Sequence, residues 1–238
     1  MSKRTFDDFD GFADEYRAIH TQNIKLSGAD SFYFAEMKVR LLQSLETDRP
    51  LRVLDVGCGD GTTEQFMQQY FPQWQTDGID IAAKSIELAK KRKLANANFA
   101  VYDGCNFPFA DESFDLVFIA GVLHHIDFAL HQVMMKEINR SLKKGGSLVL
   151  FEHNPLNPLT RYLVKTCVFD LQAKLLPHYY TSKLLIQNSL LIKEKKFIIF
   201  FPRKGLLSKL IFLEKYLHWL PLGGQYFIWA KKQASIQI

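Results

Sequence analysis

Blocks of apolar residues separated by polar, helix-forming stretches predict a sheet of buried strands connected by helices. Residues 53–56 (Val-Leu-Asp-Val) form an apolar run broken by a single acid, which is typical of a central parallel strand. Three alternating glycines, Gly57, Gly59 and Gly61, follow at once and predict a tight backbone turn against a ligand. A helix is expected over residues 61–71, where a proline ends it.

The start of this helix has its own signal. Thr62 and Gln65 fit the Ser/Thr-x-x-Glu/Gln pattern, in which two side chains cap the first helical turn reciprocally. We therefore expect the side chain of Thr62 to cap the helix.

The same alternation continues along the chain and defines an α/β fold. Further strands are predicted over residues 74–81 and 98–102, up to residues 120–122, up to residue 152, and over residues 197–201 and 225–230, with a helix over 182–193. Alternating strands and helices over residues 51–152 imply a doubly wound, mostly parallel sheet with helices on both faces.

Three segments lie outside this alternation. Residues 1–50 are expected to form a helical lead-in or lid, because apolar residues recur there at helix spacing. The main domain, residues 51–238, contains insertions at about 153–180 and 204–222. Within the second insertion, leucines and a tryptophan over residues 206–222 predict an amphipathic lid or surface helix.

An acid at the end of the second predicted strand indicates a nucleotide site. Asp80 lies 23 positions after Gly57, and an acid about 20 residues after the first glycine binds the ribose diol in nucleotide-binding α/β units. A carboxylate suits this task because it accepts two hydroxyl hydrogen bonds at once. The same carboxylate can also cap the helix that follows at Ala82, and the two roles are compatible.

The glycine spacing favours one cofactor over another. Dinucleotide-binding turns have the pattern G-x-G-x-x-G, whereas this turn is G-x-G-x-G with Thr62 in the last glycine position. Asp55 and Asp60 add negative charge, which repels a pyrophosphate and attracts the sulfonium and ammonium groups of S-adenosylmethionine. We therefore expect S-adenosylmethionine rather than NAD.

Five segments in order carry a resemblance to a known family. They are Val-Leu-Asp-Val-Gly-Cys-Gly-Asp-Gly from residue 53, Gly-Ile-Asp from 78, Val-Tyr-Asp-Gly from 101, Ser-Phe-Asp-Leu-Val-Phe-Ile-Ala-Gly-Val-Leu-His-His-Ile from 113, and Leu-Lys-Lys-Gly-Gly-Ser-Leu-Val-Leu-Phe-Glu from 142. With them, residues 40–153 resemble class I S-adenosylmethionine-dependent methyltransferases of the small-molecule and quinone-methylating type. The resemblance implies a seven-stranded sheet in the order 3-2-1-4-5-7-6, with the last strand antiparallel.

The resemblance also implies which residues bind the cofactor. They lie at the ends of the first four strands: Asp55, Gly57, Cys58, Gly59, Asp80, Ile81, Asp103, Gly104, Ala120, Gly121 and Val122. In such enzymes the first group holds the methionine part, Asp80 the ribose, and Asp103 the adenine amino group.

Histidines at two strand ends are the candidates for proton removal from a methyl acceptor. His125 follows the fourth strand and His153 the fifth, and histidine accepts a proton near neutral pH. Packing or capping is the alternative role for both. Candidate acceptor contacts are Tyr16, Tyr33, His124 and Asn154. No metal is expected, because adjacent side chains such as those of His124 and His125 are predicted to diverge.

Charge divides the chain into two parts. Up to residue 150 there are 17 Lys plus Arg against 21 Asp plus Glu, and beyond it 13 against 4. We expect methylation, at oxygen, of a small molecule such as a sugar, a polyketide-like compound or a quinone. The basic, leucine-rich C-terminal part also allows an anionic membrane surface or a lipid-linked acceptor. The alternatives are a nucleic-acid methyltransferase and a catalytically inactive cofactor-binding protein.

The remaining composition predicts a cytoplasmic protein. No stretch approaches the ~20 apolar residues of a membrane span, and the first residues lack the apolar core of a signal peptide. Three scattered cysteines are too few for a disulfide framework or a zinc site.

Overall fold

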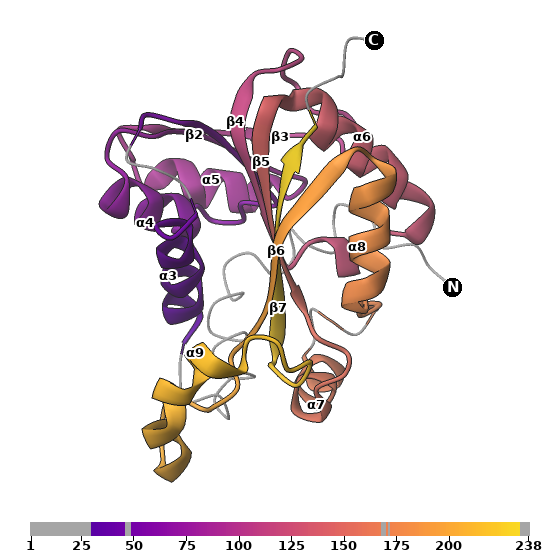
Figure 1. Ribbon diagram of the computed structural model, residues 1–238. Coiled ribbons are helices and arrows are strands. Elements are labelled where there is room, and N and C mark those ends of the chain that lie inside the picture. Colours follow the sequence, from indigo (N-terminus) through magenta and orange to yellow (C-terminus); the bar gives the residue numbers. More distant parts are fainter. Residues whose placement is uncertain (1–29, 46–48, 168–169, 171, 234–238) are drawn as a thin grey trace.

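Seven strands form one sheet in the order β3-β2-β1-β4-β5-β7-β6 in a computed structural model that describes residues 30–45, 49–167, 170 and 172–233 (Figure 1). The strands are β1 Arg52–Val56, β2 Gln75–Asp80, β3 Ala97–Val101, β4 Phe114–Ala120, β5 Leu142–His153, β6 Leu190–Ile198 and β7 Gln225–Lys232. Strand β7 is antiparallel to β5 and β6, while the pairs from β3 to β5 are parallel. The predicted fold class and strand order are confirmed.

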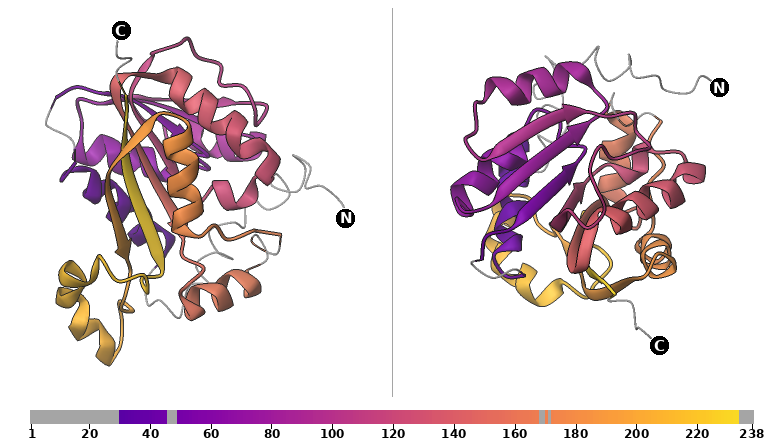
Figure 2. Two further views of the ribbon diagram at one scale, coloured as in Figure 1. Left: turned by 45° about the vertical axis from the view of Figure 1, so that its right-hand side comes forward. Right: turned by 90° about the horizontal axis from the view of Figure 1, so that it is seen from above.

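Helices cover both faces of this sheet. The longer ones are α3 Ser31–Leu42, α4 Thr62–Tyr70, α5 Ala83–Lys91, α6 His131–Ser141, α7 Pro158–Thr166 and α8 His178–Gln187. Helices α3, α4 and α5 lie on one face, and α6 and α8 on the other (Figures 1 and 2). This is the doubly wound arrangement that the alternation of strands and helices predicts.

Alternation along each strand explains the two layers of core. In β1, Leu54 and Val56 pack in the cluster that contains α6 and α8, whereas Val53 packs in the cluster that contains α3 and α4. Successive side chains of a strand point to opposite faces, so a strand covered on both sides must be apolar throughout. The lead-in helix α3 takes part in this core, because Val39 and Leu42 are buried in the same cluster.

Two local predictions are wrong. Thr62 does not cap α4: Gly61 is the N-cap, with φ +77°, and the Thr62 hydroxyl donates to Asp60 instead. The helix predicted over residues 182–193 is α8 followed by β6, which begins at Leu190. Strand β6 is an edge strand that pairs only with β7, and its lysine-rich sequence suits a half-exposed edge.

The second insertion is less regular than the predicted helix. It forms the 3₁₀ helix η5 Leu206–Leu213 and the short helix α9 Glu214–Leu217. In the part of the chain that the structure describes, no helix is long and apolar enough to cross a membrane.

The strand directions bring the functional segments to one edge of the sheet. Strands β1, β2, β3, β4, β5 and β6 are mutually parallel and end at the same edge, which we call the carboxyl edge. The glycine turn follows β1 there, and the two insertions follow β5 and β6. Helices α7 and α9 accordingly project from the same lower end of the molecule in Figure 1.

Candidate cofactor and acceptor site

The turn after β1 forms a backbone cradle at the carboxyl edge. The backbone N–H groups of Gly57 and Cys58 donate hydrogen bonds to the carbonyl oxygen of Ile79, at 2.8 and 3.1 Å. Gly57 has φ +77°, and a Cβ added there would lie 2.4 Å from Cγ2 of Val122. A Cβ added to Gly59 would meet no described heavy atom within 4 Å. The cradle is therefore tightly packed at Gly57 and open at Gly59.

The carboxylate of Asp80 faces this cradle from the end of β2. Its Oδ2 accepts a hydrogen bond from the N–H of Gly59, and its Oδ1 accepts one from the N–H of Ala82, both at 2.9 Å. The helix cap expected from the sequence is not formed, because Ala82 is the N-cap of α5 and no side chain caps that helix. Asp80 instead holds the turn before α5 and lies beside the glycine turn. Its contact with a ribose stays a prediction.

The loop after β3 is shaped by Asp103. Its Oδ1 accepts hydrogen bonds from the N–H groups of Asn106 and Cys105, and its Oδ2 accepts one from the Asn106 amide. These bonds hold the pKa of Asp103 below its usual range, so its carboxyl is ionised at neutral pH. Gly104 lies against Ile81, because a Cβ at Gly104 would be 3.4 Å from Ile81 Cγ2.

The end of β4 completes the row of strand ends. Gly121, which follows Ala120 with φ +71°, donates its N–H to the carbonyl oxygen of Phe151 at 2.9 Å. The loop therefore stays paired with β5 before it turns away at Val122. The predicted cofactor residues thus lie along the adjacent ends of β1, β2, β3 and β4, where open α/β sheets bind ligands.

Two buried acids lie behind the cradle. Asp55, in β1, is 2% exposed and Glu64, in α4, is fully buried. Both carboxyl oxygens of Glu64 lack a hydrogen-bond partner among the described residues. Burial raises the pKa of Asp55 to about 7, and burial together with the negative charge of Asp55 raises the pKa of Glu64. Burial therefore favours the neutral forms of both carboxyls.

Asp60, which was expected to add negative charge at the turn, is paired with a cation. Its carboxylate accepts a hydrogen bond from Nη2 of Arg92 at 2.9 Å, and the two form an ion pair. Arg92 follows α5, so its proximity to the turn depends on tertiary packing. The acid that bonds directly to the glycine turn is Asp80.

Lys38, on the lead-in helix α3, is the cation that sequence reasoning missed. Burial lowers its pKa to about 8, although the negative charges of Glu152 and Asp55 oppose this shift. Its Nζ lies 5.8 Å from the centre of the Phe151 ring. The sequence feature that could have identified Lys38 is its spacing. Lys38 precedes the core residue Leu42 by one helical turn, so the two residues share the inward face of the helix.

A buried histidine connects β4 to β5. His124, 3% exposed, has its Nδ1 2.6 Å from Oε2 of Glu152, and its Nε2 3.7 Å from Oδ1 of Asp170. The other oxygen of Glu152 accepts the N–H of Leu123 at 2.8 Å. Burial alone would lower the pKa of His124, but Glu152 and Asp170 together raise it to about 9.

His125 and His153, the two candidate bases, have different surroundings. His125 Nε2 lies 3.4 Å from the same oxygen of Asp170, and a fifth of its side chain is exposed. Burial and the positive charge of His124 lower the pKa of His153 to about 4. His125, paired with a carboxylate and open to solvent, therefore suits proton removal better than His153.

The prediction that adjacent histidines diverge is wrong here. The ring centres of His124 and His125 are 4.2 Å apart, because the 3₁₀ turn η2 Leu123–His125 follows β4 directly. Both rings lie close to Asp170, which the sequence analysis did not select as a site residue. The sequence feature that could have identified it is that Asp170 is the only acid between residues 153 and 193.

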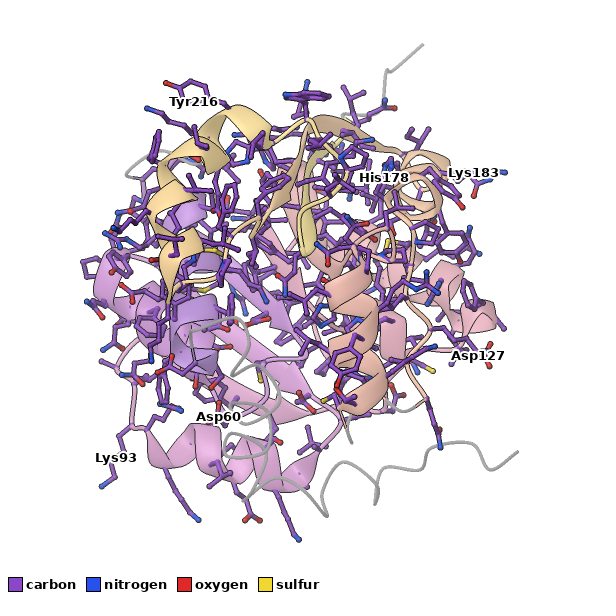
Figure 3. The ribbon with its side chains drawn as sticks, turned by 90° about the horizontal axis from the view of Figure 1, so that it is seen from below. Asp60, Lys93, Asp127, His178, Lys183 and Tyr216 are labelled. Atoms are coloured by element: carbon purple, nitrogen blue, oxygen red, sulfur yellow. The ribbon has the colours of Figure 1, made fainter. Side chains whose placement is uncertain are left out.

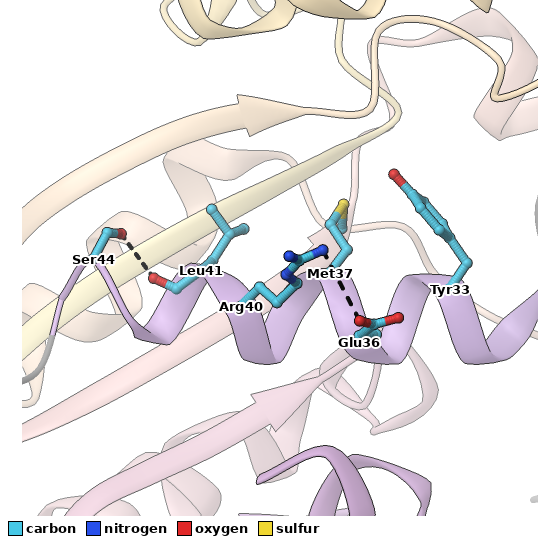
Figure 4. A pocket seen from close by; sticks show the side chains of 6 residues that line it. All are labelled: Tyr33, Glu36, Met37, Arg40, Leu41 and Ser44. Carbon is cyan, nitrogen blue, oxygen red and sulfur yellow. Dashed lines mark hydrogen bonds and ion pairs between the residues drawn. The ribbon is translucent and has the colours of Figure 1, made fainter. Parts of the chain in front are cut away.

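The remaining acceptor candidates have mixed positions. The Asn154 amide donates to the carbonyl oxygens of Pro221 and Gly223, and its oxygen accepts the N–H of Leu156, so it joins the two insertions and is not free for a substrate. Tyr33 lines a pocket of about 290 Å³ along α3, away from the cradle (Figure 4). Tyr16 lies outside the described residues.

Comparisons with known proteins relate the chain to methyltransferases. Residues 53–146 match a family model described as a methyltransferase domain. The demethylmenaquinone methyltransferase of Thermotoga maritima is 30% identical over 149 residues, which are 63% of this chain and 61% of the relative. The human protein named probable tRNA methyltransferase 9B is 31% identical over 136 residues, 56% of this chain and 28% of that protein. The chain thus spans less than two thirds of these relatives.

A solved structure extends the likeness to the fold. An S-adenosylmethionine-dependent methyltransferase of Thermotoga maritima superimposes with a TM-score of 0.68 at 20% identity, covering 96% of this chain and all of that one. This likeness shows that the chain has the mostly parallel α/β fold of class I methyltransferases. The family model adds that residues 53–146 are similar to a methyltransferase domain, as the resemblance implied.

Proposed function

We propose that this protein transfers a methyl group from S-adenosylmethionine to a hydroxyl oxygen of a small-molecule acceptor. The observation that carries the proposal is the position of His125 and Asp170 at the carboxyl edge, beside the ends of the strands that form the cofactor cradle. The acceptor classes that we favour are a sugar, a polyketide-like compound or a quinone. The relative named demethylmenaquinone methyltransferase supports the quinone class.

The residues present suit the cofactor. Asp80 offers a carboxylate to the two ribose hydroxyls, and Asp55 offers one to the ammonium group. Lys38, which lies in the field of Asp55, is our candidate for binding the carboxylate of the methionine part. When bound, S-adenosylmethionine supplies an electrophilic methyl carbon, and the C–S bond breaks as the acceptor oxygen bonds to that carbon.

The contribution of the protein's own residues is position and proton removal. His125 Nε2 accepts the acceptor's hydroxyl proton, and the carboxylate of Asp170 stabilises the imidazolium that forms. His124, held by Glu152, keeps Asp170 in place. Asp170 and His124 are therefore positioning residues in this proposal.

Turnover measurements test the role of His125. With a panel of hydroxyl acceptors, His125→Ala is expected to lower kcat about 10²-fold while the affinity for S-adenosylhomocysteine is unchanged. His153→Ala serves as the matched control and should change kcat less. Equal losses in both variants would contradict the assignment of the base. Tight cofactor binding without turnover on any acceptor would favour the inactive cofactor-binding alternative.

The two insertions give the site an apolar, basic margin, which we call the edge patch. Its exposed apolar residues are Leu156, Leu159, Tyr162, Leu206, Leu207, Phe212, Tyr216, Trp219 and Leu222. Its exposed cations are Arg161, Lys165, Lys204, Lys209 and Lys215. The two insertions contain two acids: Asp170, which lies beside His124 and His125, and Glu214, which pairs with Arg203. We propose that the edge patch contacts an anionic membrane that carries a lipid-linked acceptor.

Hydrogen bonds at its base make the edge patch continuous. Asn157 and Thr160, at the start of α7, donate to the carbonyl oxygens of Leu222 and Gly224. The patch therefore spans both insertions. Tyr216, in α9, lies at the periphery of the molecule in Figure 3.

A nucleic acid is the second candidate acceptor. The relatives named tRNA methyltransferase 9B and the basic C-terminal part of the chain favour it. Exposed leucines among the lysines of the second insertion argue for lipid instead. A steep fall of RNA binding with rising salt, together with methylation of RNA, would favour the nucleic acid.

A further inference from the structure

Three side chains at the carboxyl edge place metal-binding atoms close together. One ligand atom from each of His124, His125 and Asp170 lies within 4.8 Å of the other two. Oδ1 of Asp170 is 3.7 Å from Nε2 of His124 and 3.4 Å from Nε2 of His125. Tetrahedral zinc with bonds of about 2.1 Å needs ligand atoms roughly 3.4 Å apart. We propose that these three residues bind a divalent transition-metal ion of the zinc type.

The surroundings of His124 are those of a metal-binding imidazole. Its Nδ1 lies 2.6 Å from Glu152, whose second oxygen is held by the Leu123 N–H at 2.8 Å. A carboxylate that accepts the N–H of one ring nitrogen fixes the ring and leaves the other nitrogen as the ligand, as in carboxylate–histidine–zinc sites. Nε2 is the nitrogen that faces Asp170.

The charge balance also suits a cation. Two carboxylates, those of Glu152 and Asp170, contact the imidazoles, and Lys38 is the positive side chain that acts on Glu152. With neutral imidazoles, the two carboxylates and the ammonium group of Lys38 together carry one net negative charge.

Three protein ligands leave a fourth tetrahedral position open, as in catalytic zinc sites. This part of the inference rests on the proposed function: an acceptor hydroxyl bound at the open position would lose its proton more readily. The metal-loaded site would then use His125 as a ligand, whereas the metal-free site uses it as the base. The metal-loaded site would select acceptors with a hydroxyl group that can coordinate the metal.

Metal titration tests the site without relying on activity. The chelator-treated full-length protein is titrated with Zn²⁺ by calorimetry and with Co²⁺ by absorption, which reports tetrahedral coordination. We expect binding of one ion per chain, weakened at least tenfold in His125→Ala and in Asp170→Asn. Glu152→Gln, which changes the residue that orients His124, should weaken it roughly 10- to 100-fold. His178→Ala is the matched control, because His178 begins α8 and is not one of the three clustered residues; it is labelled in Figure 3.

Affinity for S-adenosylhomocysteine verifies that each variant is folded. Absence of Zn²⁺ binding, or equal affinity in His125→Ala, Asp170→Asn and the wild type, would overturn the metal site. Methyl transfer by protein shown to be metal-free would then leave the proposed function standing with His125 as the base. If the wild-type protein binds Zn²⁺ but methylates no hydroxyl acceptor, the metal site stands and the proposed function is wrong.

Discussion

Single residues decide how the cofactor cradle works. Gly57 is required because its φ is positive and because the space where a Cβ would stand is filled by Val122. Asp80 supports the same turn through the N–H of Gly59. Behind them, burial raises the pKa of the acids Asp55 and Glu64 and so favours their neutral forms. The cradle thus combines close packing at Gly57 with the carboxylate of Asp80 beside the turn.

We expect Gly57→Ala to weaken binding of S-adenosylhomocysteine at least tenfold, because the new methyl group would force the β4 loop to move. Gly145→Ala is the matched control: its φ is +72°, yet no described heavy atom lies within 4 Å of the added Cβ. Calorimetry on both variants separates backbone strain from the clash. Adding Val122→Ala should restore part of the affinity, and equal binding by the two glycine variants would contradict the steric argument.

Glu64 should make the stability of the protein depend on pH. Its pKa is raised in the folded state, so the folded protein holds a proton that the unfolded chain releases. Stability is therefore lost as pH rises above the unfolded pKa of about 4.5, by at most about 1.4 kcal/mol per pH unit. We expect Glu64→Gln to gain stability over the wild type as pH increases from 5 to 8.

Urea unfolding at several pH values measures this difference. Glu87→Gln, at an exposed position of α5, is the control and should give a curve parallel to that of the wild type. A parallel curve for Glu64→Gln would show that Glu64 has an ordinary pKa in the folded protein.

At the scale of elements, the insertions and the lead-in helix supply what the sheet lacks. Helix α3 contributes Lys38 to the site and Val39 and Leu42 to the core. The second insertion is anchored by Glu214, whose carboxylate accepts the N–H groups of Phe200 and Phe201. Its exposed apolar residues remain outside the core, where they can meet a partner.

We expect the full-length protein to sediment with anionic vesicles and not with neutral phosphatidylcholine vesicles, because cations and exposed apolar residues act together on the edge patch. Changing Lys204, Lys209 and Lys215 to Glu should abolish this binding. Changing Lys84, Lys90 and Lys91 of α5 to Glu makes the same change of charge elsewhere and should preserve it. If deleting residues 206–220 leaves lipid binding and acceptor turnover intact, the insertion has no role in either.

At the scale of the whole molecule, one rigid sheet holds the cradle and the histidine cluster at the same edge. Ligands bound there contact the ends of several strands at once, so binding should stabilise the entire fold. The rise in melting temperature with each ligand should therefore show which cofactor the protein binds.

S-adenosylhomocysteine at about 100 times its Kd should stabilise the protein by about 2.7 kcal/mol, which corresponds to a rise in Tm of roughly 5–11 °C for a chain of this size. NAD should give no shift, because its pyrophosphate would meet Asp55 and Asp80. Differential scanning fluorimetry with both ligands checks this, and Asp80→Ala should reduce the shift. A larger shift with NAD would contradict the cofactor assignment.

Local patterns in the sequence were enough for the α/β fold class, and the family resemblance added the strand order. The cofactor contacts of the cradle residues stay a prediction. The fold class depends on short-range rules, because apolar runs that alternate with helical stretches make buried strands connected by helices. The same rules failed at residues 182–193, because an edge strand rich in lysine resembles a surface helix when its pairing with β7 is unseen.

Tertiary packing alone decided the partners of the site residues. Asp60 pairs with Arg92, Lys38 lies in the field of Glu152, and Asp170 joins two histidines that were expected to diverge. Each contact connects residues 30 or more positions apart, and each depends on burial that no local pattern encodes. The sequence by itself therefore determined what the cradle is made of, whereas the folded chain determined which charges act on it and where an acceptor's proton can go.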